Sequence, residues 1–152
     1  MIEIIEADLS IVAHGIAIIQ LMNEYALDPM GGGKGLSDYV KQNLVSELAK
    51  RKTAHVILAF IDCEPAGLLI GLEGFSTFAC KPLLNINDVI VSLPYRGQGL
   101  SKLLFQKADE IAVELSCCKL TLEVLQGNYV AQSAYKSCGW LSRQNGVNRG
   151  KM

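Results

Sequence analysis

The sequence predicts a mixed α/β fold in which helices flank one central sheet. Three stretches repeat apolar residues at helical spacing, at about 9–26, 37–51 and 97–115, and β-branched or alternating stretches lie between them. Residues 85–104 join a strand, a proline, a glycine-rich turn and an amphipathic helix. With a fourth helix and a sixth strand expected after residue 125, the order is β-α-α-β-β-β-α-β-α-β. A chain of 152 residues buries roughly 70% of its unfolded surface, so we expect a single domain over 1–152.

Caps and apolar spacing define the helices of the first half. Asp8 or Ser10 can cap the first helix, and Ser37 or Asp38 can cap the second. Between these helices lies a glycine-rich loop at 28–35. The residues expected to form the buried face of the first helix are Val12, Ile16, Ile19 and Met22. The strands are expected over 2–7, 53–61, 66–75, 83–91 and 119–125.

Composition and charge exclude several classes of protein. The chain is 50% hydrophobic with a mean hydropathy of +0.27, yet no apolar run approaches the roughly 18 residues of a membrane span. Residues 1–8 lack the basic-then-apolar pattern of a secretion signal, so we expect a cytoplasmic protein without a membrane partner. With a net charge of −1, the chain lacks the excess of basic residues expected of a nucleic-acid-binding protein. The five cysteines form no CxxC pair, so we expect reduced cysteines and no metal.

The glycine-rich turn after the 83–91 strand has the character of a phosphate site. Gly97 and Gly99 can adopt backbone angles that other residues avoid, and they carry no Cβ to obstruct a ligand. The amides of the following helical turn lack intrahelical partners and lie at the positive end of the helix dipole. A dinucleotide fingerprint would need a third glycine where Lys102 stands, and no Gly-Lys-Ser or Gly-Lys-Thr of a P-loop occurs in the chain.

Two motifs in this part of the chain resemble those of the GNAT superfamily of acetyl-CoA-dependent N-acetyltransferases. The sequence Arg96-Gly97-Gln98-Gly99-Leu100-Ser101 fits the acyl-CoA-binding pattern Q/R-x-x-G-x-G/A, with Ser101 in place of the usual Gly or Ala. The sequence Asn128-x-x-Ala131-x-x-x-Tyr135-x-x-x-Gly139-Trp140 is similar to the second signature of that family. The two motifs occur in the order expected of the family and, with the strand before them, cover residues 85–140.

The resemblance implies a GNAT-like, mostly antiparallel sheet flanked by helices and acetyl-CoA as co-substrate, without a metal. Arg96 and the amides at the start of the helix would hold the pyrophosphate, while the exposed backbone of the preceding strand would pair with the pantetheine arm. Asn128 would contact the cofactor or the backbone. The residues implied in cofactor binding are Val89, Ile90, Val91, Arg96, Gly97, Gln98, Gly99, Leu100, Ser101, Lys102, Asn128 and Tyr135.

The implied reaction is direct attack of a primary amine, from a small molecule or a peptide, on the thioester carbonyl. Tyr135 would donate a proton to the departing thiolate, as the resemblance suggests. A carboxylate would accept the proton of the amine, and Glu123 is favoured because strand alternation directs it away from the expected core. Asp88 and Glu73 on neighbouring strands are alternatives, as is a reaction without a dedicated base.

The end of the sequence departs from the family pattern. Only twelve residues follow Trp140, and they are polar and rich in glycine, so the sequence predicts a shortened C-terminus without the final hairpin strand. An open sheet edge would then invite pairing with a second copy, and we expect a homodimer. Loss of the acceptor site would leave a catalytically silent acyl-CoA-binding module, which is the alternative function. A nucleotide-binding or purely structural domain is a third.

Overall fold

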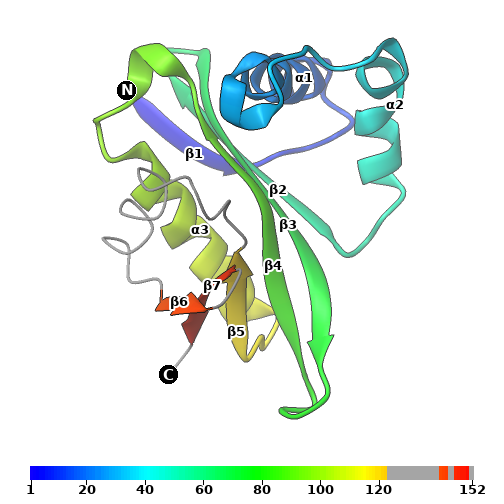
Figure 1. The fold of residues 1–152 in the computed structure, drawn as a ribbon, viewed down its shortest axis with the longest axis vertical. Coiled ribbons are helices and arrows are strands. Elements are labelled where there is room, and N and C mark those ends of the chain that lie inside the picture. The colour runs from blue at the N-terminus through cyan, green and yellow to red at the C-terminus, as the bar shows by residue number, and fades with distance from the viewer. Residues whose placement is uncertain (123–140, 144–145, 151–152) are drawn as a thin grey trace.

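The computed structural model describes residues 1–122, 141–143 and 146–150. In those residues seven strands form one sheet in the order β1-β2-β3-β4-β5-β7-β6 (Figure 1). Neighbouring strands are antiparallel except for the parallel pair of β4 and β5. The strands are β1 Ile2–Glu6, β2 Ala54–Ile61, β3 Glu64–Ser76, β4 Lys81–Val91, β5 Lys119–Leu122, β6 Leu141–Arg143 and β7 Gly146–Gly150. The expected mixed, mostly antiparallel sheet is therefore confirmed.

The described helices cover both faces of this sheet. Helices α1 and α2 lie on one face and α3 lies on the other (Figure 1). Their bounds are α1 Val12–Leu27, α2 Asp38–Ala49 and α3 Leu100–Glu114, with short 3₁₀ turns η1 at Pro29–Gly31 and η2 at Leu93–Tyr95. No helix of the described residues is both long and apolar enough to cross a membrane. The remaining helix expected after β5 lies outside the described residues.

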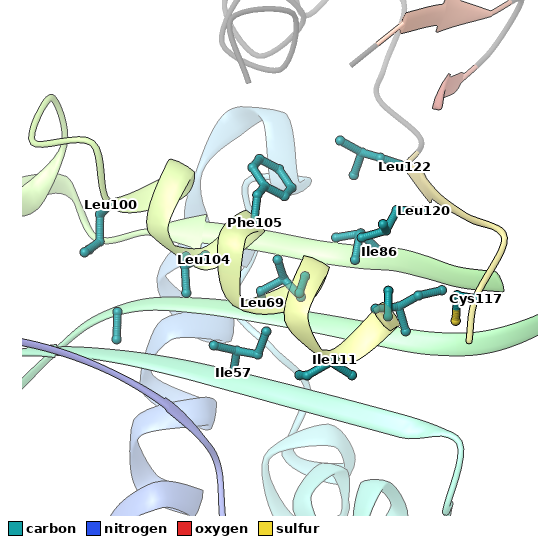
Figure 2. Packing of buried hydrophobic residues seen from close by; sticks show 14 of the residues in the cluster. Ile57, Leu69, Ile86, Leu100, Leu104, Phe105, Ile111, Cys117, Leu120 and Leu122 are labelled. Atoms are coloured by element: carbon teal, nitrogen blue, oxygen red, sulfur yellow. The ribbon is translucent and has the colours of Figure 1, made fainter. Parts of the chain in front are cut away.

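The larger core lies between α3 and the sheet. Leu104 and Phe105 of α3 are almost completely buried and pack with Ile57 of β2, Leu69 of β3 and Ile86 of β4 (Figure 2). Helix α3 is thereby fixed against the sheet by its apolar stripe, as helical periodicity predicts. A second cluster joins α1 and α2 to the opposite face of β2, β3 and β4.

The buried face of α1 differs from the expected one. Ala17, Ile18 and Leu21 are fully buried, whereas Val12 is 76% exposed and Ile16 is 61% exposed. Four-residue spacing alone does not say which of two adjacent apolar stripes will meet the sheet, and α1 is apolar around more than one face.

The helix caps are partly as predicted. Helix α1 begins after Ile11 without a side-chain cap, because Asp8 instead accepts hydrogen bonds from the backbone and hydroxyl of Ser10. At α2 the prediction is confirmed, since the hydroxyl of Ser37 accepts from Val40 N.

The expectation that the final hairpin strand is absent is wrong. Strand β7 pairs with β5, placing Val147 opposite Leu122 and Arg149 opposite Leu120, and β6 pairs with β7 as a hairpin. Main-chain hydrogen bonds hold such strands together without requiring apolar side chains, so a polar, glycine-containing stretch can still complete a sheet. Because β7 covers the edge of β5, the argument that predicted a homodimer is lost, and the homodimer stays a prediction.

Candidate active site

The candidate site contains a β-bulge in β4. Strands β4 and β5 pair only from Leu84 to Ile86 on the β4 side. On its other side β4 shifts register against β3 between Ile70 and Gly71, which leaves Asn87 as an extra residue without a partner. A bulge of this kind bends its strand and increases the local twist. Beyond Ile86, β4 therefore continues without β5 beside it in the described residues.

After the bulge, one edge of the β4 main chain has no partner strand among the described residues. Ser92 N donates to Ala66 O, so the amide groups of Ser92 face β3, and alternation turns those of Val91 and Val89 away from β3. The same alternation directs the main chain of Ile90 into the β3 ladder, where its own groups are used. Of the three strand residues implied in cofactor binding, Val89 and Val91 can thus offer their amides to a ligand and Ile90 cannot.

The glycine turn that follows adopts the backbone that the sequence predicts. Gly97 has φ +81° and Gly99 has φ +77°, in the left-handed region, and Gly99 is the N-cap residue of α3 without a side-chain cap. A Cβ at either glycine would meet nothing within 4 Å. The first-turn amides of α3, at Leu100, Ser101 and Lys102, therefore border open space. The helix begins at Leu100 rather than at the expected residue 97.

The side chains around this turn are mostly exposed. Gln98 and Lys102 are exposed and Ser101 is half-buried, while Leu100 is buried in the core and offers only its amide. Arg96 is exposed, and its Nε donates to Val91 O at 2.9 Å. Arg96 therefore occupies one of the outward carbonyl groups of β4 and ties the glycine turn to the end of the strand.

Glu24 of α1 is a contributor that sequence reasoning missed. Its carboxylate accepts hydrogen bonds from Ser92 Oγ at 2.7 Å and from Leu93 N at 3.1 Å. Ser92 is the only polar residue among the buried side chains of the described residues, at 6% exposure. Because these two residues lead directly into the glycine turn, Glu24 links α1 to the start of that turn. A separation of 68 residues left no signal of this contact in the sequence.

Asp88 is the carboxylate that the structure places beside the unpaired edge of β4. Ile86 and Val89 both contact the α3-side core, so the bulge turns the two residues between them to the opposite face, toward α1. The carboxylate is partly buried, receives no hydrogen bond or ion pair from the described residues, and burial raises its pKa above the ordinary value. A carboxylate with a raised pKa and no donor is suited to accept a proton.

Glu73 does not reach this position. Strand alternation places it with Leu69 on the face covered by α3. Its Oε2 lies 2.8 Å from His55 Nε2 on β2, and both side chains are about one-quarter exposed or less. Glu73 is thus paired on the side of the sheet opposite to Asp88.

A chain of polar side chains lies on the face that carries Asp88. Thr121 Oγ1 donates to Asn85 Oδ1 at 2.6 Å, and Asn85 Nδ2 donates to Asn87 Oδ1 at 2.7 Å. The chain crosses from β5 to β4 where the two strands separate. No local pattern in the sequence marks these side chains as neighbours, because the bulge brings them together.

Three of the predicted site residues, Glu123, Asn128 and Tyr135, lie outside the described residues. The implied proton donor, the favoured base and one cofactor contact are therefore predictions from the sequence. In the part of the chain that is described, no group of three or more His, Cys, Asp and Glu side chains could hold a metal ion.

Comparison with known proteins identifies the fold and the family. The sequence profile of the acetyltransferase (GNAT) family matches residues 18–140. This chain belongs to the GNAT family. By its family the chain is an acyltransferase.

Proteins that are similar to this chain in sequence or structure are named for different acceptors. A thialysine N-epsilon-acetyltransferase of Bos taurus is 33% identical over 118 residues, which cover 68% of each chain. A Bacillus subtilis (strain 168) protein, provisionally named as a ribosomal protein bS18 alanine N-acetyltransferase, is 31% identical over 103 residues, covering 68% of this chain and 64% of the relative. An aminoglycoside acetyltransferase from an uncultured soil metagenome shares the fold, with a TM-score of 0.79 at 17% identity over 95% of this chain and 91% of its own.

Proposed function

We propose that this GNAT domain transfers an acetyl group from acetyl-CoA to a primary amine by direct attack, with Asp88 accepting the amine's proton. The observation that supports the proposal is that three parts of the site are adjacent along the chain. The first-turn amides of α3, the unpaired edge of β4 and the partly buried carboxylate of Asp88 follow one another along a single stretch of chain.

The geometry of the site fits acetyl-CoA. The amides of Leu100, Ser101 and Lys102 at the positive end of α3 suit a pyrophosphate, and the glycines leave room for it. Val91 N–H and both main-chain groups of Val89 would pair with an arm that carries amide groups. At about 3.3 Å per residue, the four steps from Val91 back to the bulge span about 13 Å. An arm laid along this edge would therefore end beside Asp88.

The residues of the chain have two tasks in the reaction. Acetyl-CoA supplies the thioester, whose carbonyl carbon gains the bond to nitrogen and loses the bond to sulfur. An alkyl ammonium has a pKa near 10.4, so it must lose one proton before it attacks and a second as the amide forms. Asp88 would receive the first proton directly or through water, and Tyr135 would donate its hydroxyl proton to the leaving thiolate and be reprotonated through water by the second. Glu123 is the alternative base.

The names of the relatives support a primary amine as the class of acceptor. These names specify thialysine and a ribosomal-protein alanine, and both of these present a primary amine. We therefore propose a primary amine on a small molecule or a peptide as the acceptor of this chain. The cytoplasmic location stays a prediction.

A thermal-shift titration with acetyl-CoA beside NADH and ATP tests the cofactor. A ligand at about 100 times its dissociation constant stabilises the folded state by roughly 2.7 kcal/mol, and we expect a shift with acetyl-CoA alone. A shift that is larger with another nucleotide would contradict the proposal. Thiol release with a panel of primary amines then tests catalysis, and binding without any thiol release would favour the silent acyl-CoA-binding module.

Two variants separate the candidate bases. Asp88→Asn should lower kcat by about 10²–10⁴-fold, the usual contribution of a general base, with little change in the dissociation constant of acetyl-CoA. Glu123→Gln is the matched control and should retain most of the activity. The reverse pattern would assign the base to Glu123 and contradict the role of Asp88.

A further inference from the structure

We infer that Asn87 recognises the acceptor by donating its side-chain N–H to a carbonyl or carboxylate oxygen on the carbon next to the amine-bearing carbon. This inference rests on the proposed function. It makes the preferred acceptor an α-amino compound, such as the N-terminus of a peptide, rather than a side-chain or alkyl amine that has no neighbouring carbonyl.

The hydrogen-bond chain leaves Asn87 with a free donor. The Oδ1 atom of Asn87 accepts from Asn85 Nδ2, and Asn85 Oδ1 accepts from Thr121. An asparagine amide has two N–H donors on Nδ2, and the Nδ2 atom of Asn87 has no partner in the described residues. The chain thus runs from the Thr121 hydroxyl to an outward-facing N–H pair.

The charge of Asp88 supports this orientation of the Asn87 side-chain amide, in which Oδ1 faces Asn85 and Nδ2 is free to bind a ligand. Asn87 and Asp88 are consecutive and share the α1-side face because of the bulge. A carboxylate beside Asn87 favours an N–H donor nearby and disfavours a second oxygen. Asn87 is exposed, so its donor is accessible to a ligand at the surface.

The spacing of the two groups matches an α-amino carbonyl unit. Consecutive Cα atoms are 3.80 Å apart, so Asp88 and Asn87 present an acceptor and a donor side by side. Standard N–Cα, Cα–C and C=O bond lengths place the carbonyl oxygen of an α-amino compound about 3 Å from its nitrogen. An amine at the end of a lysine-like side chain lies several bonds farther from any carbonyl and would leave Asn87 bound to water.

Asn85 and Thr121 are positioning residues in this arrangement. Thr121 donates to Asn85 and Asn85 donates to Asn87, so each orients the next amide, while only Asn87 would touch the acceptor. A side chain held by such a chain loses less freedom when a ligand binds, which favours the bound geometry.

A single peptide with a free N-terminus and one lysine tests the inference by internal competition. The protein would acetylate this peptide with acetyl-CoA, and fragmentation mass spectrometry would give the ratio of α-amine to side-chain acetylation. We expect the α-amine to dominate with the unmodified protein. Loss of one hydrogen bond in Asn87→Ala should lower the ratio about five- to tenfold. Because both amines share one enzyme and one cofactor, the ratio does not depend on folded fraction or cofactor affinity.

Two further variants complete the design. Thr121→Val preserves shape but removes the hydroxyl that starts the chain, so it should lower the ratio in the same direction by a smaller factor, and it carries the test if Asn87→Ala does not fold. Asn43→Ala, which removes an amide from α2 that bonds only within its own helix, should leave the ratio unchanged.

The outcomes separate this inference from the proposed function. A ratio that is unchanged or raised in both Asn87→Ala and Thr121→Val would overturn the role of Asn87. Acetylation of the lysine alone by the unmodified protein would also overturn it while sustaining the N-acetyltransferase function. Acetylation at neither amine would overturn the inference, and the amine panel would then decide the function independently.

Discussion

Replacing Glu24 with alanine should weaken both the fold and the binding of acetyl-CoA. The carboxylate of Glu24 accepts from the buried hydroxyl of Ser92 and from the backbone of Leu93. Hydrogen bonds to a charged group contribute about 1.5–3 kcal/mol each. The Leu93 amide is in an exposed bond and can recruit water, whereas the hydroxyl of Ser92, 6% exposed, cannot do so readily.

These contributions set the expected magnitude. Counting the full loss at Ser92 and a partial loss at Leu93 gives about 3 kcal/mol of destabilisation. A protein of this size loses roughly 2–4 °C in Tm for each kcal/mol, so Glu24→Ala should unfold about 6–12 °C lower. Since Gly97 of the glycine turn lies four residues after Leu93, a part of that free energy, about 1 kcal/mol, should appear as roughly fivefold weaker acetyl-CoA binding.

A double-mutant cycle measures the contact itself. Glu24→Ala, Ser92→Ala and the double variant would be unfolded in denaturant, and acetyl-CoA binding would be measured for each by calorimetry. We expect the two substitutions to be strongly non-additive, by more than about 1 kcal/mol, because both remove the same contact. Glu3→Ala, at an exposed position of β1, is the control and should change neither quantity. Additive effects within about 0.5 kcal/mol would refute the linkage between α1 and the turn.

Three further predictions concern the cofactor turn, the base and the acid. Gly99→Glu should abolish acetyl-CoA binding, measured by calorimetry, since it strains the left-handed backbone and places a negative charge at the anion site; retained affinity would contradict the placement of that site. Asp88→Asn should raise Tm at pH 7 because burial, which raises the pKa of Asp88, penalises the charged form only in the folded state. The gain should vanish below the ordinary aspartate pKa of about 3.9, and a gain that persists there would indicate a packing effect instead. Tyr135→Phe should slow thiol release with little change in acetyl-CoA affinity, and unaltered turnover would exclude it as the acid.

Local signals in the sequence predicted the backbone of the glycine turn, the buried face of α3 and one helix cap. Positive φ angles at Gly97 and Gly99 follow from a residue type that alone adopts them freely, and the core face of α3 follows from apolar periodicity. The cap of α2 at Ser37 is a similar local rule. Each of these features depends on residues within a few positions of one another, so the local sequence is enough to predict it.

Features that depend on tertiary contacts were not predictable in the same way. Helix α1 carries apolar residues around most of its circumference, so the choice of Ile18 over Ile16 for burial was made by the packing of the sheet. The pairing of β7 with β5 uses main-chain groups that every residue possesses, and a polar stretch gives no sign of it. The bond from Glu24 to Ser92 joins segments 68 residues apart, and no local pattern marks either partner.

One inserted residue in β4 accounts for the arrangement of the candidate site. The bulge at Asn87 follows the last described pair of β4 and β5, and beyond it the outer main-chain groups of Val89 and Val91 have no neighbouring strand in the described residues. The same insertion places Asn87 and Asp88 next to each other on one face, which regular alternation would forbid. The proposed proton acceptor and the proposed donor to the acceptor's carbonyl therefore depend on the same local change in the register of one strand, and both lie beside the strand edge proposed to bind the cofactor.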